Sequence, residues 1–220
     1  MAIKNVFNLK KETMLIIVGS LLLIISFILF HYNKIEEINN QIYNYIQAEI
    51  FKEKTTLNNI SVNIDVDYVE SDKEIEEIDD NNYTPNYIAF LEIEKINLKQ
   101  GLLSKNSYYN NVDYRIEILG ISDYPDIVNG NFILASHSGS SSISYFKNLY
   151  KLKLGDIAKV YYQSKVYKYN IVNIYNQEKD GSVNIYRDTN KTTMTFVTCT
   201  RNDKNSQTIY ILELIGVESY

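Results

Sequence analysis

Residues 14–30, MLIIVGSLLLIISFILF, form a run of seventeen positions without a charged side chain. As an α-helix this run is about 25 Å long, close to the ~30 Å hydrocarbon core of a bilayer. A cleaved signal peptide is the alternative, but no small-x-small cleavage pattern follows the run, and it is longer than the usual apolar core of such a peptide. We therefore expect a transmembrane anchor over residues 14–31, with His31 at the membrane boundary.

The charges that flank this run predict its orientation. Lys4, Lys10 and Lys11 precede it, and positive charge is retained on the cytoplasmic side of a membrane. Residues 1–13 are therefore expected to be a cytoplasmic N-terminus, and everything after residue 31 is expected to lie outside the membrane.

Residues 32–83 are predicted to be an amphipathic helix followed by an acidic linker. Apolar residues recur at helical spacing in the first part, at Ile35, Ile38, Ile42, Ile46 and Ile50. Such a helix can serve as a stalk, a dimer seam or a lid, and we favour a stalk. Residues 65–80 carry nine acidic side chains against Lys73. They lack the glycine and terminal glutamate of an EF-hand loop, so we interpret them as a solvated linker.

Residues 84–220 show a different pattern, in which short apolar runs are separated by turn residues. The runs are rich in Val, Ile, Tyr and Phe, which favours strands at 87–94, 96–103, 131–136, 157–163, 165–175, 193–200 and 208–217. A short helix is expected over 143–151. Many short strands with so little helix indicate a mainly β domain, a closed or nearly closed β-barrel. Its 15 basic and 13 acidic residues nearly balance, which argues against nucleic acid as a partner.

Cys199 is the only cysteine of the chain, so neither an internal disulfide nor a multi-cysteine metal site is possible. A buried core cysteine is one interpretation of a thiol at the end of the run TFVTCT. An unpaired thiol on the oxidising side of a membrane favours a functional one. A nucleophilic thiol needs a base or a cation beside it, and the chain has only His31 and His137. His137 ends the strand NFILAS and opens the polar stretch HSGSSS, so His137 and Cys199 form the candidate pair.

Several fragments around these two residues occur in a familiar order. They are Leu134-Ala135-Ser136-His137, then Tyr145 to Leu149, then Leu152-Lys153-Leu154-Gly155-Asp156, and finally Phe196-Val197-Thr198-Cys199-Thr200. Together with the N-terminal anchor, this order over residues 84–217 resembles the sortases, membrane-anchored cysteine transpeptidases of Gram-positive bacteria.

The resemblance implies an eight-stranded sortase-type barrel with one or two short helices over residues 84–220. It implies that Cys199 attacks an LPXTG-like sorting signal of a surface protein and forms a thioester. His137 would then protonate the leaving amine and deprotonate an acceptor amine of a peptidoglycan precursor or a pilin. No cofactor and no metal are implied.

This sequence departs from the family's pattern at two places. Ser136 replaces the usual glycine before the histidine. The family's arginine precedes the last strand, where this chain has Gln207, and the nearest arginine is Arg201. Arg201 shares a strand face with Cys199 if the strand continues beyond Thr200, so we favour Arg201 for that role, with Gln207 as the alternative.

The subclass and the reaction leave alternatives open. A short connection between residues 175 and 192 disfavours a class B sortase, and no Asp-Pro-aromatic lid of class C precedes residue 84. A housekeeping-like or class D/E-like enzyme remains, and the class D/E-like one is favoured. A thiol peptidase without transfer and a non-catalytic surface-binding barrel are the alternative functions.

Overall fold

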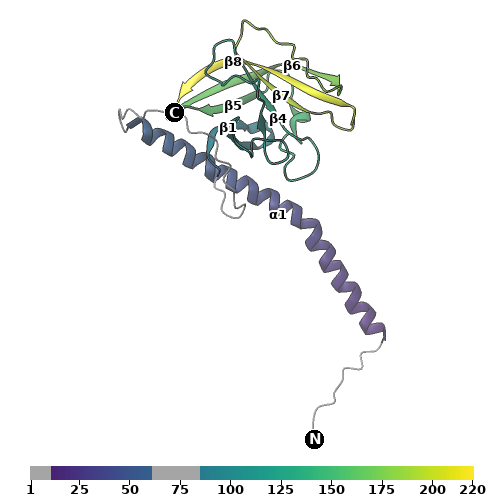
Figure 1. The fold of residues 1–220 in the computed structure, drawn as a ribbon. Helices are drawn as coiled ribbons and strands as arrows, with labels where there is room; N and C mark the ends of the chain where they lie inside the picture. The colour runs from purple at the N-terminus through teal and green to yellow at the C-terminus, as the bar shows by residue number, and fades with distance from the viewer. Residues whose placement is uncertain (1–10, 61–84) are drawn as a thin grey trace. The chain divides into compact units, whose positions relative to one another are not determined.

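The computed structural model describes residues 11–60 and 85–220. Two elements dominate it, a long N-terminal helix and an eight-stranded sheet that curls into a nearly closed barrel (Figure 1). The acidic run 65–80 lies outside the described residues. The elements are α1 Lys11–Ile60, β1 Tyr87–Ile93, η1 Glu94–Ile96, β2 Leu98–Leu103, β3 Glu117–Ile118, β4 Asn131–Ala135, η2 Leu149–Lys151, β5 Ile157–Tyr162, β6 Lys165–Glu178, β7 Thr193–Cys199 and β8 Ser206–Ser219.

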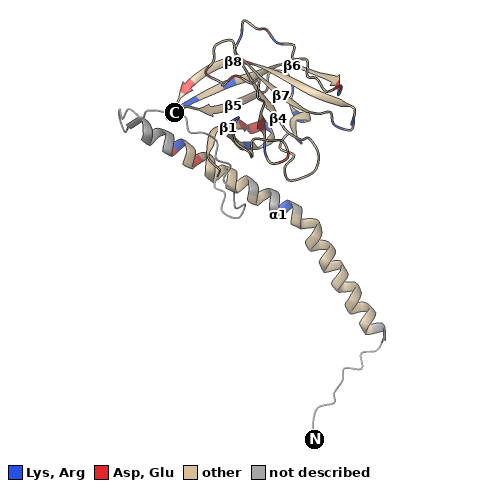
Figure 2. Cartoon of the chain, viewed as in Figure 1, with Lys and Arg blue, Asp and Glu red and all other residues tan. Residues whose placement is uncertain are grey.

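The chain divides into two compact units, the first up to Ile42 and the second from Tyr43 to Tyr220. In the first unit, α1 contains a stretch from Thr13 to Tyr32 that is long and apolar enough to cross a membrane. This stretch carries no Asp, Glu, Lys or Arg side chain and is drawn in tan throughout (Figure 2).

In the second unit the last part of α1 packs on the barrel. Ala48 is buried in a cluster with Phe90 and Leu103, and the ring of Phe51 lies 5.1 Å from that of Phe90. The amide of Asn44 donates to the side-chain oxygen of Gln100 over 2.7 Å. This packing differs from the stalk favoured above, since a stalk would leave these side chains in water.

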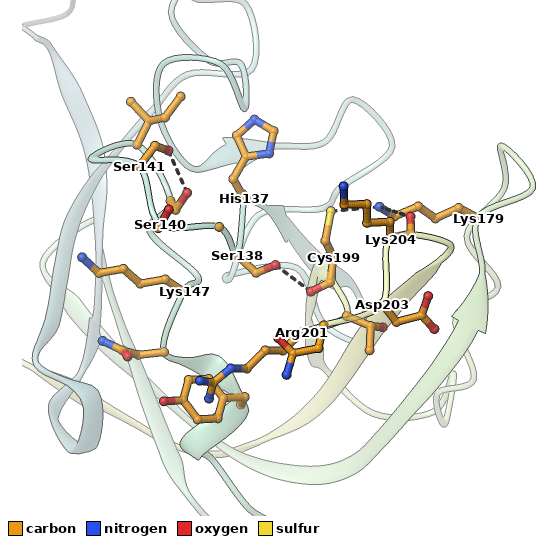
Figure 3. Close-up of a pocket in the computed structure, with 17 residues that line it drawn as sticks. His137, Ser138, Ser140, Ser141, Lys147, Lys179, Cys199, Arg201, Asp203 and Lys204 are labelled. Carbon is orange, nitrogen blue, oxygen red and sulfur yellow. Dashed lines mark hydrogen bonds between the residues drawn. The ribbon is translucent and has the colours of Figure 1, made fainter.

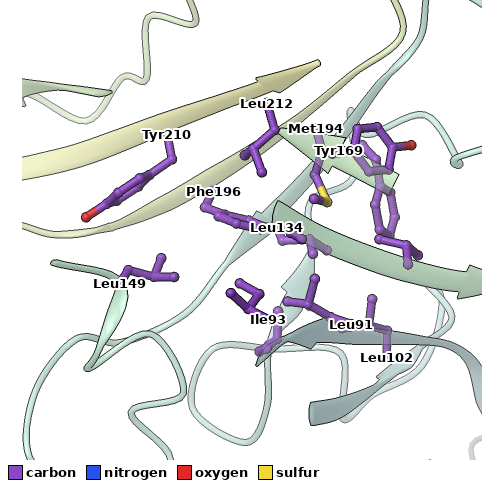
Figure 4. Close-up of a cluster of buried hydrophobic side chains, with 14 of the residues drawn as sticks. Leu91, Ile93, Leu102, Leu134, Leu149, Tyr169, Met194, Phe196, Tyr210 and Leu212 are labelled. Carbon is purple, nitrogen blue, oxygen red and sulfur yellow. The ribbon is translucent and has the colours of Figure 1, made fainter. Parts of the chain in front are cut away.

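The strand order is β2-β1-β5-β6-β8-β7-β4-β3, and the two edge strands, β2 and β3, lie in contact, which nearly closes the barrel. Each strand pair is antiparallel except β4 with β7, which run parallel. Apolar side chains from opposite walls fill the interior, as at Leu91, Leu134, Tyr169, Phe196 and Leu212 (Figure 4).

The predicted strands are present, while the helix expected over 143–151 is shorter. Only Leu149–Lys151 forms a 3₁₀ turn. The backbone N–H of Phe146 donates to the carbonyl of His137 over 3.0 Å, so a tertiary hydrogen bond replaces a helical one. Strand β3 was not predicted, because two residues carry no periodicity.

Candidate active site

The parallel pairing of β4 with β7 brings the two candidate catalytic residues together. Ala135 pairs with Val197 at the end of the ladder. Two residues further along each chain segment, the same register places His137 beside Cys199. Neighbouring strands lie about 5 Å apart, and parallel strands present residues of equal register on the same face. Two segments separated by more than 60 residues thus deliver an imidazole and a thiol to one end of the barrel.

Hydrogen bonds beyond the ladder hold both strand ends in this register. The hydroxyl of Thr198 donates to the carbonyl of Ser136 over 2.8 Å, and the hydroxyl of Ser138 donates to the carbonyl of Cys199 over 2.7 Å. The backbone N–H of Ser136 donates to the carbonyl of Val197. Ser136, which stands where the family's pattern has glycine, has a buried side chain whose hydroxyl makes no hydrogen bond within the described residues.

A cleft of about 1000 Å³ opens in front of this pair. Three parts of the chain form its walls: the loop that follows β4, Lys179 at the end of β6, and the turn from Cys199 to Lys204 (Figure 3). Four serines line it, at 138, 140, 141 and 144. An open cleft with small polar side chains on one wall leaves room for an extended peptide beside the thiol.

His137 and Cys199 are both accessible from the cleft. The His137 side chain is 40% exposed, and its Nε2 lies 3.5 Å from a carboxylate oxygen of Asp113, a residue of the loop between β2 and β3. Cys199 is half-buried and is a free thiol. A solvent-accessible thiol beside an imidazole that faces a carboxylate can carry out nucleophilic acyl transfer with acid–base assistance.

The strand that carries Cys199 does not continue toward Arg201. β7 ends at Cys199, and the chain turns after Thr200, where the N–H of Asp203 donates to the carbonyl of Thr200. The same-face argument for Arg201 therefore does not hold. Arg201 still lines the cleft, with its guanidinium stacked 3.8 Å from the centre of the Tyr150 ring.

Gln207 lies directly opposite Cys199 in the β7–β8 ladder, which is the register that the family's arginine position implies. Its amide nitrogen, however, donates to the carbonyl of Ser182 over 2.7 Å. Gln207 is also not among the described residues that line the cleft. Neither Arg201 nor Gln207, the two residues predicted for the arginine role, donates a hydrogen bond to the sulfur.

A lysine that sequence reasoning missed contacts the sulfur. The Nζ of Lys179 donates to the Sγ of Cys199 over 3.1 Å (Figure 3). Lys179 follows β6, which pairs with β8, and β8 pairs in turn with β7. No local pattern around Lys179 marks it, because its proximity to Cys199 arises across two antiparallel ladders.

The carboxylate of Asp203 lines the same cleft as these cations. Its pKa lies below the usual range because the Ser206 hydroxyl and the N–H of Asn205 donate to it, and the positive charge of Lys179 adds to the effect. Asp203 is therefore an anion at neutral pH. Within the described residues, no group of three or more His, Cys, Asp and Glu side chains is arranged to hold a metal ion.

Solved structures with this fold are sortases of several classes. The sortase D5 transpeptidase of Clostridium perfringens is 26% identical, with a TM-score of 0.51 over 62% of this chain and 84% of that chain. Sortase C1 of Streptococcus agalactiae is 25% identical, with a TM-score of 0.50 over 59% and 68% of the two chains. A lid mutant of sortase A from Corynebacterium diphtheriae, 18% identical, shares the fold with a TM-score of 0.54 over 63% and 75%.

A comparison with curated protein sequences gave no match. The model of the sortase domain family, in contrast, matches residues 91–213, which include His137, Lys179 and Cys199. That match covers more than half of the chain, so the protein belongs to the sortase family, whose members are cysteine transpeptidases.

Proposed function

We propose that this sortase cleaves an LPXTG-like sorting signal at the C-terminus of surface proteins and transfers the acyl group to an amine of a peptidoglycan precursor or a pilin. The observation that supports this proposal is the shared register of His137 and Cys199 at the floor of an open cleft. A covalent thioester divides a difficult acyl transfer into two easier steps.

In the first step the thiolate of Cys199 attacks the carbonyl carbon of the scissile peptide. A C–S bond forms, and the π electrons of the carbonyl move to its oxygen. When this tetrahedral intermediate collapses, the C–N bond breaks, and protonated His137 gives its proton to the departing amine. The acyl group of the sorting signal then remains on Sγ as a thioester.

In the second step an acceptor amine attacks the thioester carbonyl. Neutral His137 takes a proton from the amine, the C–S bond breaks, and Cys199 leaves as a thiolate. An amide replaces the thioester, and both side chains return to their starting charge. Microscopic reversibility requires the same histidine to act as acid and then as base.

For the oxygen that becomes negative in both steps, we propose Arg201 as the donor, with Gln207 as the alternative. Stacking on Tyr150 occupies the face of the Arg201 guanidinium and leaves its N–H edge for a substrate oxygen. The threonine hydroxyls near Cys199 already donate their protons to other groups of the protein. Thr198 donates to Ser136, and Thr200 pairs with Thr208, whose own proton goes to Asn176.

We further propose that the chain is a single-pass membrane protein whose barrel lies outside the cell. The anchor of residues 14–31 supports this location, together with the lysines that precede it. A surface location would place the cleft where secreted substrates and cell-wall precursors meet.

The test of function uses the whole chain, purified in detergent, and a panel of sorting-signal peptides. Mass spectrometry is expected to find an acyl-enzyme on Cys199 with one peptide, and a peptide–amine product when an amine such as triglycine is added. Cys199→Ala should remain folded by circular dichroism and form neither species. Hydrolysis without amine incorporation would identify a thiol peptidase, and an unreactive thiol would identify a non-catalytic binding barrel. Either result contradicts the transpeptidase proposal.

A further inference from the structure

We propose that Lys179 is a catalytic residue, the cation that holds the sulfur of Cys199 as a thiolate in the free enzyme. The proposal rests on the proposed function of Cys199 as the nucleophile. It assigns to the end of β6 a charge that the family pattern assigns to the start of the last strand, where this chain has the neutral Gln207.

Contacts on both sides of Lys179 fix the position of its ammonium. Its backbone N–H donates to the carbonyl of Asn205 over 2.8 Å, and Nζ donates to the carbonyl of Lys204 over 3.3 Å as well as to Sγ over 3.1 Å. An ammonium has three donors, so the two bonds that Nζ makes leave one N–H for a substrate oxygen. The side chain is thus tied both to the last residue of β7 and to the turn that follows it.

The backbone just after Lys179 restricts where this lysine can lie. Gly181 has a φ of +89°, a conformation that L side chains rarely adopt. The carboxylate of Asp180 accepts from both the N–H and the hydroxyl of Ser182, which closes the turn. Ser182 in turn binds the amides of Gln177 and Gln207 through its carbonyl. Gln207 therefore contributes to the site by holding the turn that positions Lys179.

The ammonium of Lys179 donates to the sulfur of Cys199, and other charged side chains line the same cleft. The titratable and charged side chains of the cleft besides Lys179 and Cys199 are His137, Lys147, Tyr150, Arg201, Asp203 and Lys204. Of these, Arg201 is stacked on Tyr150, and Asp203 accepts from Ser206. A cation in direct contact with a thiol favours its anionic form, and this anion is the nucleophilic one.

Lys179, as the counter-ion of the thiolate, also leaves His137 free to act as the acid. In the proposed first step, Cys199 must be deprotonated while His137 still holds the proton for the leaving amine. With a lysine beside the sulfur, both conditions are met in one charge state over a wider pH range than an imidazole alone allows.

The experiment measures the rate at which iodoacetamide alkylates the full chain in detergent between pH 5 and 10.5. Cys199 is the only cysteine, so the rate reports on a single sulfur. A neighbouring cation of this kind shifts such a titration by about one pH unit or more. Lys179→Gln is therefore expected to move the midpoint of the rate–pH curve up by about one unit, and Lys179→Arg to restore it.

The charge control is Lys147→Gln, because Lys147 lines the far wall of the same cleft, away from Cys199 in Figure 3. Its removal is expected to move the midpoint by less than about 0.3 units, since the charge acts at a distance through solvent. Lys179 is exposed, so its replacement removes no core packing, and circular dichroism is expected to be unchanged.

An unchanged midpoint in Lys179→Gln, or an equal shift in Lys147→Gln, overturns the proposal. Alkylation needs no substrate, so it tests the role of Lys179 independently of the proposed function. A shifted midpoint with no peptide cleaved would support Lys179 as the counter-ion and contradict the transpeptidase function. Peptide cleavage with an unshifted midpoint would support the transpeptidase function and contradict the role of Lys179.

Discussion

At the scale of single residues, we propose that two cations share the work for which the family's pattern has one arginine. Lys179 contacts the sulfur, and Arg201 borders the cleft with its donor edge free of the ring on which it stacks. The two cations differ in kind. A lysine ammonium is a compact point charge suited to a single anion, while a guanidinium presents a planar set of five donors to an oxygen.

The residue-scale prediction concerns the donor to the substrate oxygen. Removal of one positioned oxyanion donor typically costs a factor of about 100 to 1000 in rate. Arg201→Ala is therefore expected to lower kcat/KM for the cleaved peptide by about 100-fold, with Gln207→Ala reducing it far less. Steady-state kinetics on both variants, each checked for folding, decide between them. A nearly silent Arg201→Ala beside a crippled Gln207→Ala would transfer the role to the neutral amide.

At the scale of elements, the parallel pair β4–β7 is the feature that creates the site. In an antiparallel pair the C-terminal ends of two strands lie at opposite edges, whereas here His137 and Cys199 follow the same edge. The turn after β7 then shapes the third wall of the cleft. A short strand β7 that stops at Cys199 leaves the thiol half-buried rather than enclosed.

The element-scale prediction concerns α1. If residues 14–31 anchor the chain with its N-terminus in the cytoplasm, protease added to intact protoplasts is expected to remove the barrel from the membrane fraction. Immunoblotting with an antibody against the barrel measures this loss, and a cytoplasmic marker protein controls for lysis. Full protection of the barrel in sealed cells would show that the orientation is inverted.

At the scale of the whole molecule, buried tyrosines link stability to alkaline pH. Burial raises the pKa of Tyr210 to about 12, and burial, together with the nearby Tyr167 and Asp126, also raises the pKa of Tyr169. In the unfolded chain a tyrosine ionises near pH 10. Their contribution to stability is therefore complete below about pH 10 and is lost as the pH rises above it, because the unfolded state then binds fewer protons.

The whole-molecule prediction follows from Tyr169, whose hydroxyl is buried and makes no hydrogen bond within the described residues. Each such tyrosine steepens the fall in unfolding free energy by up to about 1.4 kcal/mol per pH unit above pH 10. Tyr169→Phe keeps the ring and removes a buried hydroxyl without a partner, so it should be at least as stable as the parent at pH 7 and fall less steeply from pH 10 to 12. Urea unfolding followed by circular dichroism measures both slopes, and equal slopes would contradict the prediction.

The amino-acid sequence by itself predicted an apolar N-terminal helix and seven of the eight strands, and the structure has both. These features rest on local signals: a run without charge, and β-branched and aromatic residues in short stretches. Motifs in a fixed order also predicted His137 and Cys199 as a catalytic pair; the β4–β7 register brings the two residues together, and their catalytic role stays a prediction. The hairpin turn between β5 and β6 shows the limit of such signals. Gln163 and Ser164 both adopt positive φ there, although neither is a residue that favours it.

What only the tertiary structure decided is which side chains meet at Cys199. Lys179 lies twenty residues earlier in the chain, and two ladders, β6 with β8 and β8 with β7, bring it to the sulfur. The same fold turns the chain after Thr200, so that Arg201 leaves the strand face, and ties Gln207 to Ser182. Strand register is set by the packing of the whole barrel, and a contact that depends on two registers leaves no trace in the residues next to either partner.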